Sequence, residues 1–147
     1  IYLFGNGGSA ADAQHIAAEL VGRYKMKRKS IPAISFTTDT SILTSMSNDY
    51  SFNKIFSRQC EGLVNQDDIV IAISTSGNSM NVINGVISAR KKGAKIIGLL
   101  GKKGGNLKKM VDIPLIVDSC STPRIQEVHR VIYHTICELV EKEFVNK

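Results

Sequence analysis

The stretch Asp68–Ser79, DIVIAISTSGNS, decides the fold. Its first half is apolar at every position from Ile69 to Ile73, so both faces of the predicted strand must be covered, as in the middle of a parallel sheet with helices on both sides. Its second half is a turn of small polar residues, and a helix-forming segment follows it. A strand, a polar turn and a helix in this order predict an α/β unit.

The same alternation continues in both directions along the chain. The other expected strands are Ile1–Phe4, Pro32–Phe36, Lys95–Leu100 and Ile113–Val117. The expected helices span residues 10–22, 40–47, 53–63, 80–92, 106–110 and 123–143. We therefore predict a single α/β domain over residues 1–147, a three-layer, doubly wound, five-stranded parallel sheet flanked by helices.

The composition is that of an ordinary globular domain, with 43% hydrophobic and 22% charged residues in 147. No apolar run is long enough to cross a bilayer, so no membrane partner is expected. Cys60, Cys120 and Cys137 are widely spaced and form no CxxC pair, which argues against a disulfide framework or a zinc finger and favours the cytoplasm. Because the chain opens without Met in an apolar run, we expect further residues upstream, including a helix that covers the first strand.

Basic residues outnumber acidic ones by 19 to 13, which gives a net charge of +6. This balance suits nucleic acids and small anionic substrates equally well. The densest basic stretch, Lys25–Lys29 (KMKRK), has no aromatic residue interleaved. We interpret it as a solvated loop after a helix and expect no nucleic-acid partner.

The polar turn at residues 74–79 (STSGNS) has the features of a phosphate-binding loop. It places four hydroxyls and a glycine at the carboxyl end of a central strand, where backbone N–H groups of the next helix also favour an anion. It contains no lysine, so the nucleotide-hydrolase P-loop pattern is absent, and Gly5–Ser9 (GNGGS) lacks the GxGxxG spacing of a dinucleotide site. A simple helix cap is the alternative interpretation, but the second glycine-rich turn at the same sheet edge weakens it.

Two groups of residues could carry proton chemistry. His15 and Glu19 are four apart on a helix that we expect to begin with Ser9 as its N-cap and Asp12 in a capping-box-like position. The pair lies on one helix face, where it could bind a metal, set a base beside an acid, or form a surface interaction. On the last helix, Gln126 and His134 are eight apart and could converge on one point.

The remainder of the last helix looks structural. His129 lies farther round the helix than Gln126 and His134, so we expect it to pack or to form a surface hydrogen bond. The apolar residues at helical spacing predict the face that packs on the core, namely Ile125, Val128, Ile132, Ile136 and Leu139.

Three segments together resemble the signatures of one family. They are Gly5–His15 (GNGGSAADAQH), Ile73–Ser79 (ISTSGNS) and Arg124–His129 (RIQEVH). They resemble sedoheptulose-7-phosphate isomerases, also called phosphoheptose isomerases, of the sugar isomerase (SIS) domain superfamily. The resemblance covers nearly the whole chain and implies the flavodoxin-like SIS fold, with a helix before the first strand.

The resemblance also implies roles for particular residues. It implies that Glu19 and His134 are the catalytic acid/base pair, and that zinc is bound in some members by His15, Glu19, Gln126 and His134. The residues implied to bind the substrate are Ser9, Ser74, Thr75, Ser76 and Ser79 at the phosphate and Asn6 and Asp39 at the sugar hydroxyls. Gly7 and Gln126 are implied as further substrate-binding residues. A homotetramer with sites at subunit interfaces is implied as well. One departure is Pro123, where some members carry an aspartate near the substrate.

The implied reaction is the conversion of sedoheptulose 7-phosphate to D-glycero-D-manno-heptose 7-phosphate through an enediol, the first step of ADP- or GDP-heptose biosynthesis. Two alternatives stay open. A related SIS protein associates with the replication initiator without known catalysis, but it lacks a histidine at the position of His134. Other SIS domains sense sugar phosphates and regulate transcription, usually with a helix-turn-helix domain that this sequence does not contain.

Overall fold

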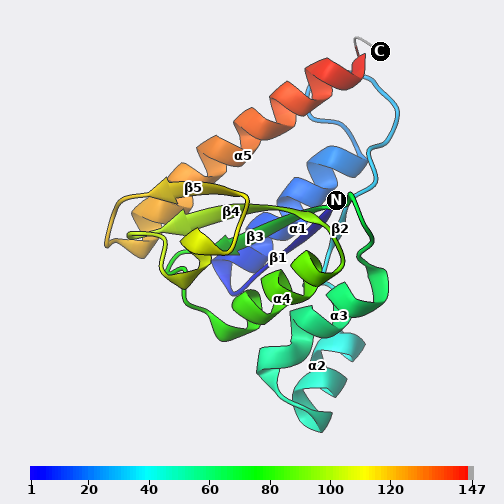
Figure 1. Cartoon of the computed structure of the whole chain (residues 1–147). Helices are drawn as coiled ribbons and strands as arrows, with labels where there is room; N and C mark the ends of the chain where they lie inside the picture. The colour runs from blue at the N-terminus through cyan, green and yellow to red at the C-terminus, as the bar shows by residue number, and fades with distance from the viewer. Residues whose placement is uncertain (146–147) are drawn as a thin grey trace.

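The computed structural model describes residues 1–145 and contains one five-stranded, fully parallel sheet in the order β2-β1-β3-β4-β5 (Figure 1). This is the flavodoxin-like order, and the predicted fold class is confirmed. The strands are β1 Tyr2–Gly5, β2 Ile34–Ser35, β3 Ile69–Ser74, β4 Lys95–Gly101 and β5 Ile113–Val117.

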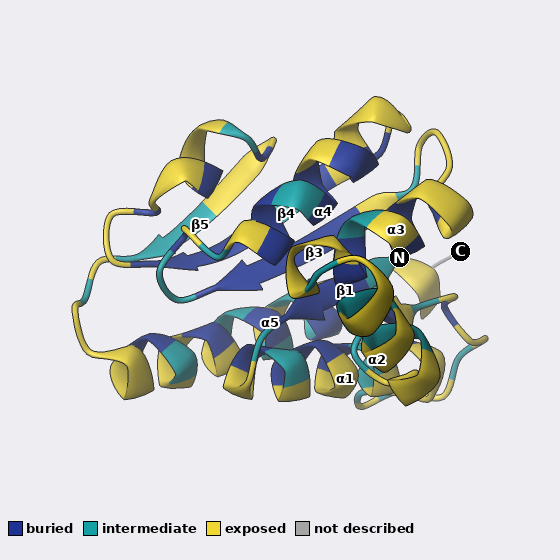
Figure 2. Ribbon diagram, turned by 90° about the horizontal axis from the view of Figure 1, so that it is seen from below, coloured by how far each residue is buried: buried dark blue, intermediate teal, exposed yellow. Residues whose placement is uncertain are grey.

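Helices cover both faces of the sheet (Figure 1). The helices are α1 Gly8–Val21, α2 Thr40–Asp49, α3 Ile55–Leu63, α4 Met80–Lys91 and α5 Thr122–Val145, with 3₁₀ turns η1 Phe52–Lys54 and η2 Asn106–Lys109. Helices α1 and α5 lie on one face and α3 and α4 on the other, so the mostly dark, buried strands β1, β3 and β4 lie between two helical layers, whereas β5 at the edge is more exposed (Figure 2). No helix within residues 1–145 is long and apolar enough to cross a bilayer.

The strand residues alternate between two apolar cores. Leu3, Ile71 and Ile73 are buried in the core under α1 and α5, whereas Phe4 and Ala72 are buried in the core under α3 and α4. This alternation follows from the two-residue period of a strand, and it gives the sheet two apolar faces for helices to cover.

The second strand is shorter than the predicted Pro32–Phe36. It pairs only with β1, through the register Tyr2↔Ile34 and Leu3↔Ser35. Proline has no N–H to donate to a ladder, which limits how early an edge strand can begin.

Helix α1 begins two residues earlier than predicted, because its N-cap is Gly7 and not Ser9. Gly7 has φ +56° and ψ −120°, a conformation that glycine adopts far more readily than other residues. Its carbonyl accepts the N–H groups of Ala10 and Ala11. Ser9 is therefore the second residue of the helix and is buried, and Asp12 contacts α5 instead of forming a capping box.

The buried face of α5 also differs from the prediction. The buried positions recur every four residues and are Ile125, His129, Tyr133, Cys137 and Glu141. Val128 and Leu139, which were predicted in the core, are 42% and 57% exposed. They were predicted from hydropathy alone, whereas the buried face of α5 contains both apolar and polar side chains.

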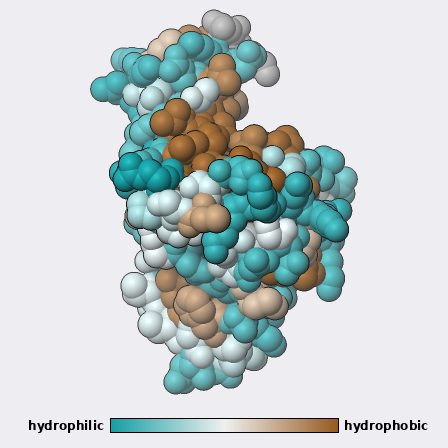
Figure 3. All heavy atoms as spheres, turned by 90° about the vertical axis from the view of Figure 1, so that its left-hand side faces the viewer, coloured by the Kyte–Doolittle hydropathy of each residue, from teal (hydrophilic) through white to brown (hydrophobic). Residues whose placement is uncertain are grey.

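On the surface, an apolar band crosses the upper part of the face shown in Figure 3.

Candidate active site

The polar turn after β3 forms a loop tied together by its own hydroxyls. Ser74 Oγ accepts the N–H of Gly77 at 3.1 Å, and Ser76 Oγ accepts the N–H of Asn78 at 3.1 Å. Ser79 is the N-cap of α4, but its side chain makes no capping hydrogen bond. Its hydroxyl lies 3.4 Å from Ser74 Oγ, so it can turn to a ligand at the helix N-terminus.

The loop between β4 and η2 supports this turn from outside. Gly77 has φ +67°, and a Cβ there would collide with the backbone of Gly104. The N–H of Asn106 donates to Asn78 Oδ1 at 2.9 Å, and the N–H of Leu107 donates to the Gly77 carbonyl. The turn is thus held in shape before any ligand binds.

The two glycine-rich turns lie side by side, as expected. Gly5 pairs with Ile73 at the ends of β1 and β3, and a Cβ on Gly5 would lie 2.8 Å from both the Ile73 carbonyl and Ser9 Cβ. Ser9 therefore reaches the edge of the sheet next to the Ser74 loop. This places one further hydroxyl beside the candidate phosphate site.

His15, Glu19 and His134 converge in the structure. His15 Nε2 lies 3.1 Å from Glu19 Oε1, and one ligand atom from each of the three residues lies within 4.8 Å of the others. Two come from α1 and the third from α5, which packs beside α1 on the same face of the sheet (Figure 1). The His15 side chain is 43% exposed and the Glu19 side chain 22%.

The donor set fits a divalent metal. Two imidazoles and one carboxylate are the protein ligands of many catalytic zinc sites. Bonds of about 2.1 Å in a tetrahedral site place neighbouring donors roughly 3.4 Å apart. The His15–Glu19 distance of 3.1 Å is close to this value, and a ligand atom of His134 lies within 4.8 Å of both residues.

The fourth predicted ligand, Gln126, is placed elsewhere. Its amide lies against Gly8, where a Cβ would collide with it. Gly8 is the first residue of α1, and His15 follows seven residues later, about 10 Å along the helix axis. One chain therefore brings together three of the four predicted ligands, while Gln126 lies near the glycine-rich turns. Its part in metal binding stays a prediction.

A buried hydrogen-bonded chain stands behind His15. Tyr133 is buried on α5, and its hydroxyl lies 3.1 Å from His15 Nδ1 and 3.4 Å from Asp12 Oδ1. Asp12 is buried on α1, and Arg130 Nε lies 3.5 Å from the same carboxylate oxygen. Burial, together with the charge of Asp12, raises the pKa of Tyr133 to about 12, so the phenol keeps its proton.

The loop after α1 holds an aromatic ring against His134. Tyr24 stacks on His134 with ring centroids 5.7 Å apart and an interplanar angle of 26°. Glu141 accepts the backbone N–H groups of Tyr24, Lys25 and Met26 at 2.7–2.9 Å. The loop is therefore anchored from beneath by a carboxylate of α5.

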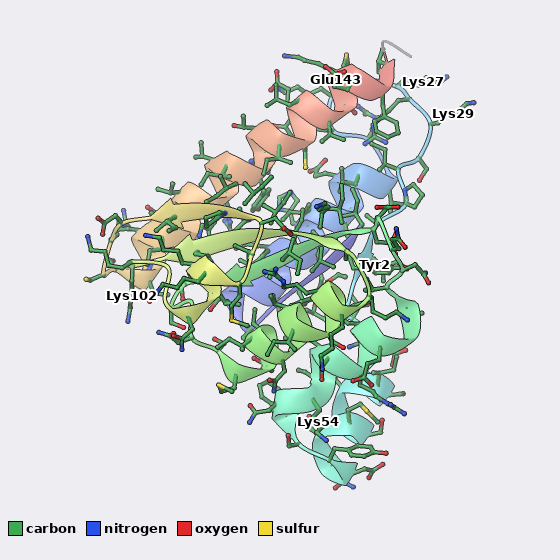
Figure 4. All side chains as sticks on the ribbon, in the orientation of Figure 1. Tyr2, Lys27, Lys29, Lys54, Lys102 and Glu143 are labelled. Carbon is green, nitrogen blue, oxygen red and sulfur yellow. The ribbon has the colours of Figure 1, made fainter. Side chains whose placement is uncertain are left out.

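Arg28 corrects the prediction that the basic stretch is simply solvated. Its side chain is only 2% exposed, and its Nε lies 3.2 Å from Glu141 Oε1. Its other nitrogens donate to the carbonyls of Glu19 and Leu20 at the end of α1. Lys27 and Lys29 on either side project outward, as Figure 4 shows. The stretch thus combines a buried structural arginine with exposed lysines.

The two residues predicted to contact the sugar, Asn6 and Asp39, lie in different surroundings. Asn6 forms a reciprocal amide pair with buried Asn81, with both bonds at 2.8 Å, and each amide keeps one further N–H. Asp39 is exposed at the N-cap of α2, where its Oδ1 accepts the N–H of Ile42. Neither arrangement excludes a sugar hydroxyl, and both roles stay predictions.

His129 is buried and lies 3.1 Å from the Leu100 carbonyl through Nε2, as the packing interpretation predicted. Burial lowers its pKa below the ordinary value, although the Leu100 hydrogen bond and the charge of Asp12 oppose this. A neutral ring that donates Nε2–H to a carbonyl serves the packing of α5 on the sheet.

Comparison with known proteins identifies the family. The SIS domain model matches residues 1–101. The phosphoheptose isomerase of Sulfurimonas denitrificans is 60% identical over 141 residues, which cover 96% of this chain and 72% of that protein. The chain belongs to the phosphoheptose isomerase family of SIS-domain proteins.

Solved structures agree with membership of the phosphoheptose isomerase family. The phosphoheptose isomerase of Neisseria gonorrhoeae superposes with a TM-score of 0.91 at 42% identity, over 96% of this chain and 75% of that one. The phosphoheptose isomerase of Francisella tularensis gives 0.92 at 38% identity over the same shares.

Several residues that support the candidate active site could not be recognised from the sequence. Tyr24, Asn81 and Tyr133 carry no motif of their own, and Arg28 and Glu141 look like surface charges. The one available signal was spacing, because Tyr133 and Glu141 lie eight and sixteen residues after Ile125, on the same four-residue repeat.

Proposed function

We propose that this chain isomerises sedoheptulose 7-phosphate to D-glycero-D-manno-heptose 7-phosphate and so begins a heptose-nucleotide biosynthesis. The observation that carries the proposal is the convergence of Glu19 and His134, together with His15, in a chain 60% identical to a phosphoheptose isomerase. A ketose–aldose isomerase needs a base at carbon and a second group at the oxygens, and a carboxylate beside an imidazole meets both needs.

The substrate phosphate would bind at the turn formed by Ser74, Thr75, Ser76 and Ser79, with Ser9 beside it. The Ser79 hydroxyl, which does not cap α4, and the N-terminus of α4 support this placement. Fixing the phosphate there leaves the carbonyl end of the sugar free to reach the acid/base pair, so that binding energy is used for orientation.

In this proposal Glu19 takes a proton from C1 of the ketose and returns one to C2. His134 moves protons between the O1 and O2 atoms as the carbonyl shifts. Tyr24 limits the tilt of the His134 ring by stacking on it. We assign the carbon proton to Glu19 because it is the only carboxylate in the group of three.

Zinc is the metal that we propose for His15, Glu19 and His134, with Gln126 as a further candidate ligand. When bound, it would supply Lewis-acid stabilisation of negative charge that develops on the substrate oxygens. The nitrogen and carboxylate donors and their spacing support this choice.

We also propose a homotetramer with its sites at subunit interfaces, acting in the cytoplasm. Enediol chemistry needs exclusion of water, yet the His15 side chain is 43% exposed in one chain. Helix α5 in addition leaves Val131 and Leu139 more than half exposed, which suits burial against a second copy.

The test is turnover of sedoheptulose 7-phosphate by the purified protein, with the aldoheptose product followed by NMR. We expect product formation that unphosphorylated sedoheptulose does not support at the same concentration. No turnover, with and without added zinc, would overturn the proposal and favour a binding protein that associates with the replication initiator, an alternative that the comparisons do not favour.

A further inference from the structure

In the hydrogen-bonded series Asp12–Tyr133–His15, the chemistry of the groups determines which atom donates each hydrogen bond. A carboxylate accepts hydrogen bonds and cannot donate them. Arg130 Nε lies 3.5 Å from Asp12 Oδ1, as expected beside a charged carboxylate. The Tyr133 hydroxyl lies 3.4 Å from that oxygen, and it carries one proton to donate.

A phenol that donates to Asp12 can only accept from His15. The 3.1 Å contact between the Tyr133 oxygen and His15 Nδ1 is then a hydrogen bond only if Nδ1 carries the proton. The lone pair of a neutral His15 is in that case on Nε2, the atom 3.1 Å from Glu19 Oε1. Two acceptor atoms at that distance repel each other unless a proton or a cation lies between them.

We propose that Asp12 and Tyr133 are positioning residues that hold the proton of His15 on Nδ1 and thereby present Nε2 to a divalent metal shared with Glu19 and His134. The inference rests on the proposed function, since it concerns the same group of three. It gives a role to Asp12 and Tyr133, two buried polar residues that the proposed substrate binding does not involve.

The arrangement explains why these two polar residues are buried. Asp12 and Tyr133 are 2% and 1% exposed, in the core between α1, α5 and the sheet. Burying a carboxylate is unfavourable unless it is paired and hydrogen-bonded. The second partner of a metal-binding histidine commonly fixes its tautomer in this way, and losing such a partner typically lowers metal affinity 10–100-fold.

The first measurement is made on the wild-type protein, and variants serve only to assign its spectra. The protein has three histidines, so long-range ¹H–¹⁵N spectra of protein labelled at histidine can be assigned with His129→Gln and His134→Asn. We expect His15 Nδ1 to carry a proton with and without zinc, and Nε2 to shift on zinc addition. A His15 that carries no proton on Nδ1 would overturn the inference, because the phenol would then be donating to the imidazole.

The second measurement is zinc affinity by calorimetry. Tyr133→Phe should bind zinc 10–100-fold more weakly than the wild type. The matched control is Tyr2→Phe, which also loses one tyrosine hydroxyl bond, here to the Leu63 carbonyl. Tyr2 packs against the core under α3 and α4, on the face of the sheet opposite His15. Equal zinc affinities in the two variants, or no zinc binding by the wild type, would overturn the inference.

Asp12→Asn keeps the shape of the carboxylate but supplies a donor. The tyrosine hydroxyl could then donate to His15, so we expect the Nδ1 proton to be lost and zinc affinity to fall at least as far as in Tyr133→Phe. A wild type that shows the expected tautomer and zinc binding but no turnover would leave this inference standing and remove the proposed function. A wild type that turns over substrate but lacks the expected tautomer or zinc binding would support the proposed function and overturn this inference.

Discussion

The ring of Tyr24 is stacked on the ring of His134, with centroids 5.7 Å apart, although the two residues lie near opposite ends of the sequence. The contact exists because Glu141 receives three successive backbone N–H groups of the loop that carries Tyr24. Arg28 adds its charge from the other side of the same carboxylate. A candidate catalytic histidine is thus supported by a buried ion pair almost two helical turns away along α5.

Glu141→Gln tests this support. Removing the charge leaves Arg28 buried without its partner, so we expect a loss of about 3 kcal/mol in the free energy of unfolding, measured with urea. The matched control is Glu138→Gln on the same helix, whose ion pairs with Lys25 and Lys142 are at the surface and should contribute little. Equal losses of unfolding free energy in both variants would contradict the stabilising role of the buried Arg28–Glu141 ion pair.

Ser79→Ala tests the phosphate loop. The Ser79 hydroxyl does not cap α4 and contacts Ser74 Oγ only at 3.4 Å, so its removal should change the free energy of unfolding little. A lost hydrogen bond to a charged phosphate is worth about 1.5–3 kcal/mol, which predicts a KM for sedoheptulose 7-phosphate about 10–100-fold higher. Steady-state kinetics and inhibition by inorganic phosphate would measure it. An unchanged KM would place the phosphate elsewhere.

His129 predicts part of the pH dependence of stability. Burial lowers its pKa in the folded state, so the unfolded chain takes up this proton first as the pH falls below about 6.5. Stability should therefore drop by up to about 1.4 kcal/mol per pH unit between that pH and the lower folded pKa.

His129→Gln removes this contribution while its amide can still donate to the Leu100 carbonyl. Urea unfolding from pH 8 to pH 5 should show a variant that is less stable at pH 8 and whose curve is flatter below pH 6.5. Parallel curves for the two proteins would show that His129 does not titrate as described.

Val131→Asp tests the proposed assembly. Val131 is 66% exposed on α5, so a charge there should not disturb the fold of one chain. If α5 packs against another copy, the charge would be buried, and sedimentation should show smaller species with reduced turnover. Thr135→Ser, a mild change one turn along the helix, is the control. A variant that keeps the wild-type mass would contradict an interface at this position.

The fold was predictable because its signals are local. The apolar run in β3 demands helices on both sides, and the turns after β1 and β3 mark the edge where ligands bind. His15 and Glu19 share a face by helical spacing alone. Their meeting with His134 was implied by family resemblance, since periodicity gives no distance between two helices.

The rest depended on tertiary packing. Hydropathy selected Val128 and Leu139 for the core, while the helix buries His129, Tyr133 and Glu141, whose partners come from distant segments. Arg28 appeared to be one of several surface charges, and only the fold places it against Glu141. Polar residues that are buried because they have partners cannot be recognised before those partners are known.

Proton transfer by Glu19 is the most direct test of the central claim. Sedoheptulose 7-phosphate would be incubated in D₂O with wild type, Glu19→Gln and His134→Asn, with zinc content and folding checked for each. We predict that the wild type forms aldoheptose 7-phosphate with deuterium at C2. Each folded variant should lose turnover by about 10²–10⁴-fold, and Glu19→Gln should also lose deuterium exchange at C1 of the ketose. A folded, zinc-loaded Glu19→Gln protein that isomerises at the wild-type rate would contradict the account.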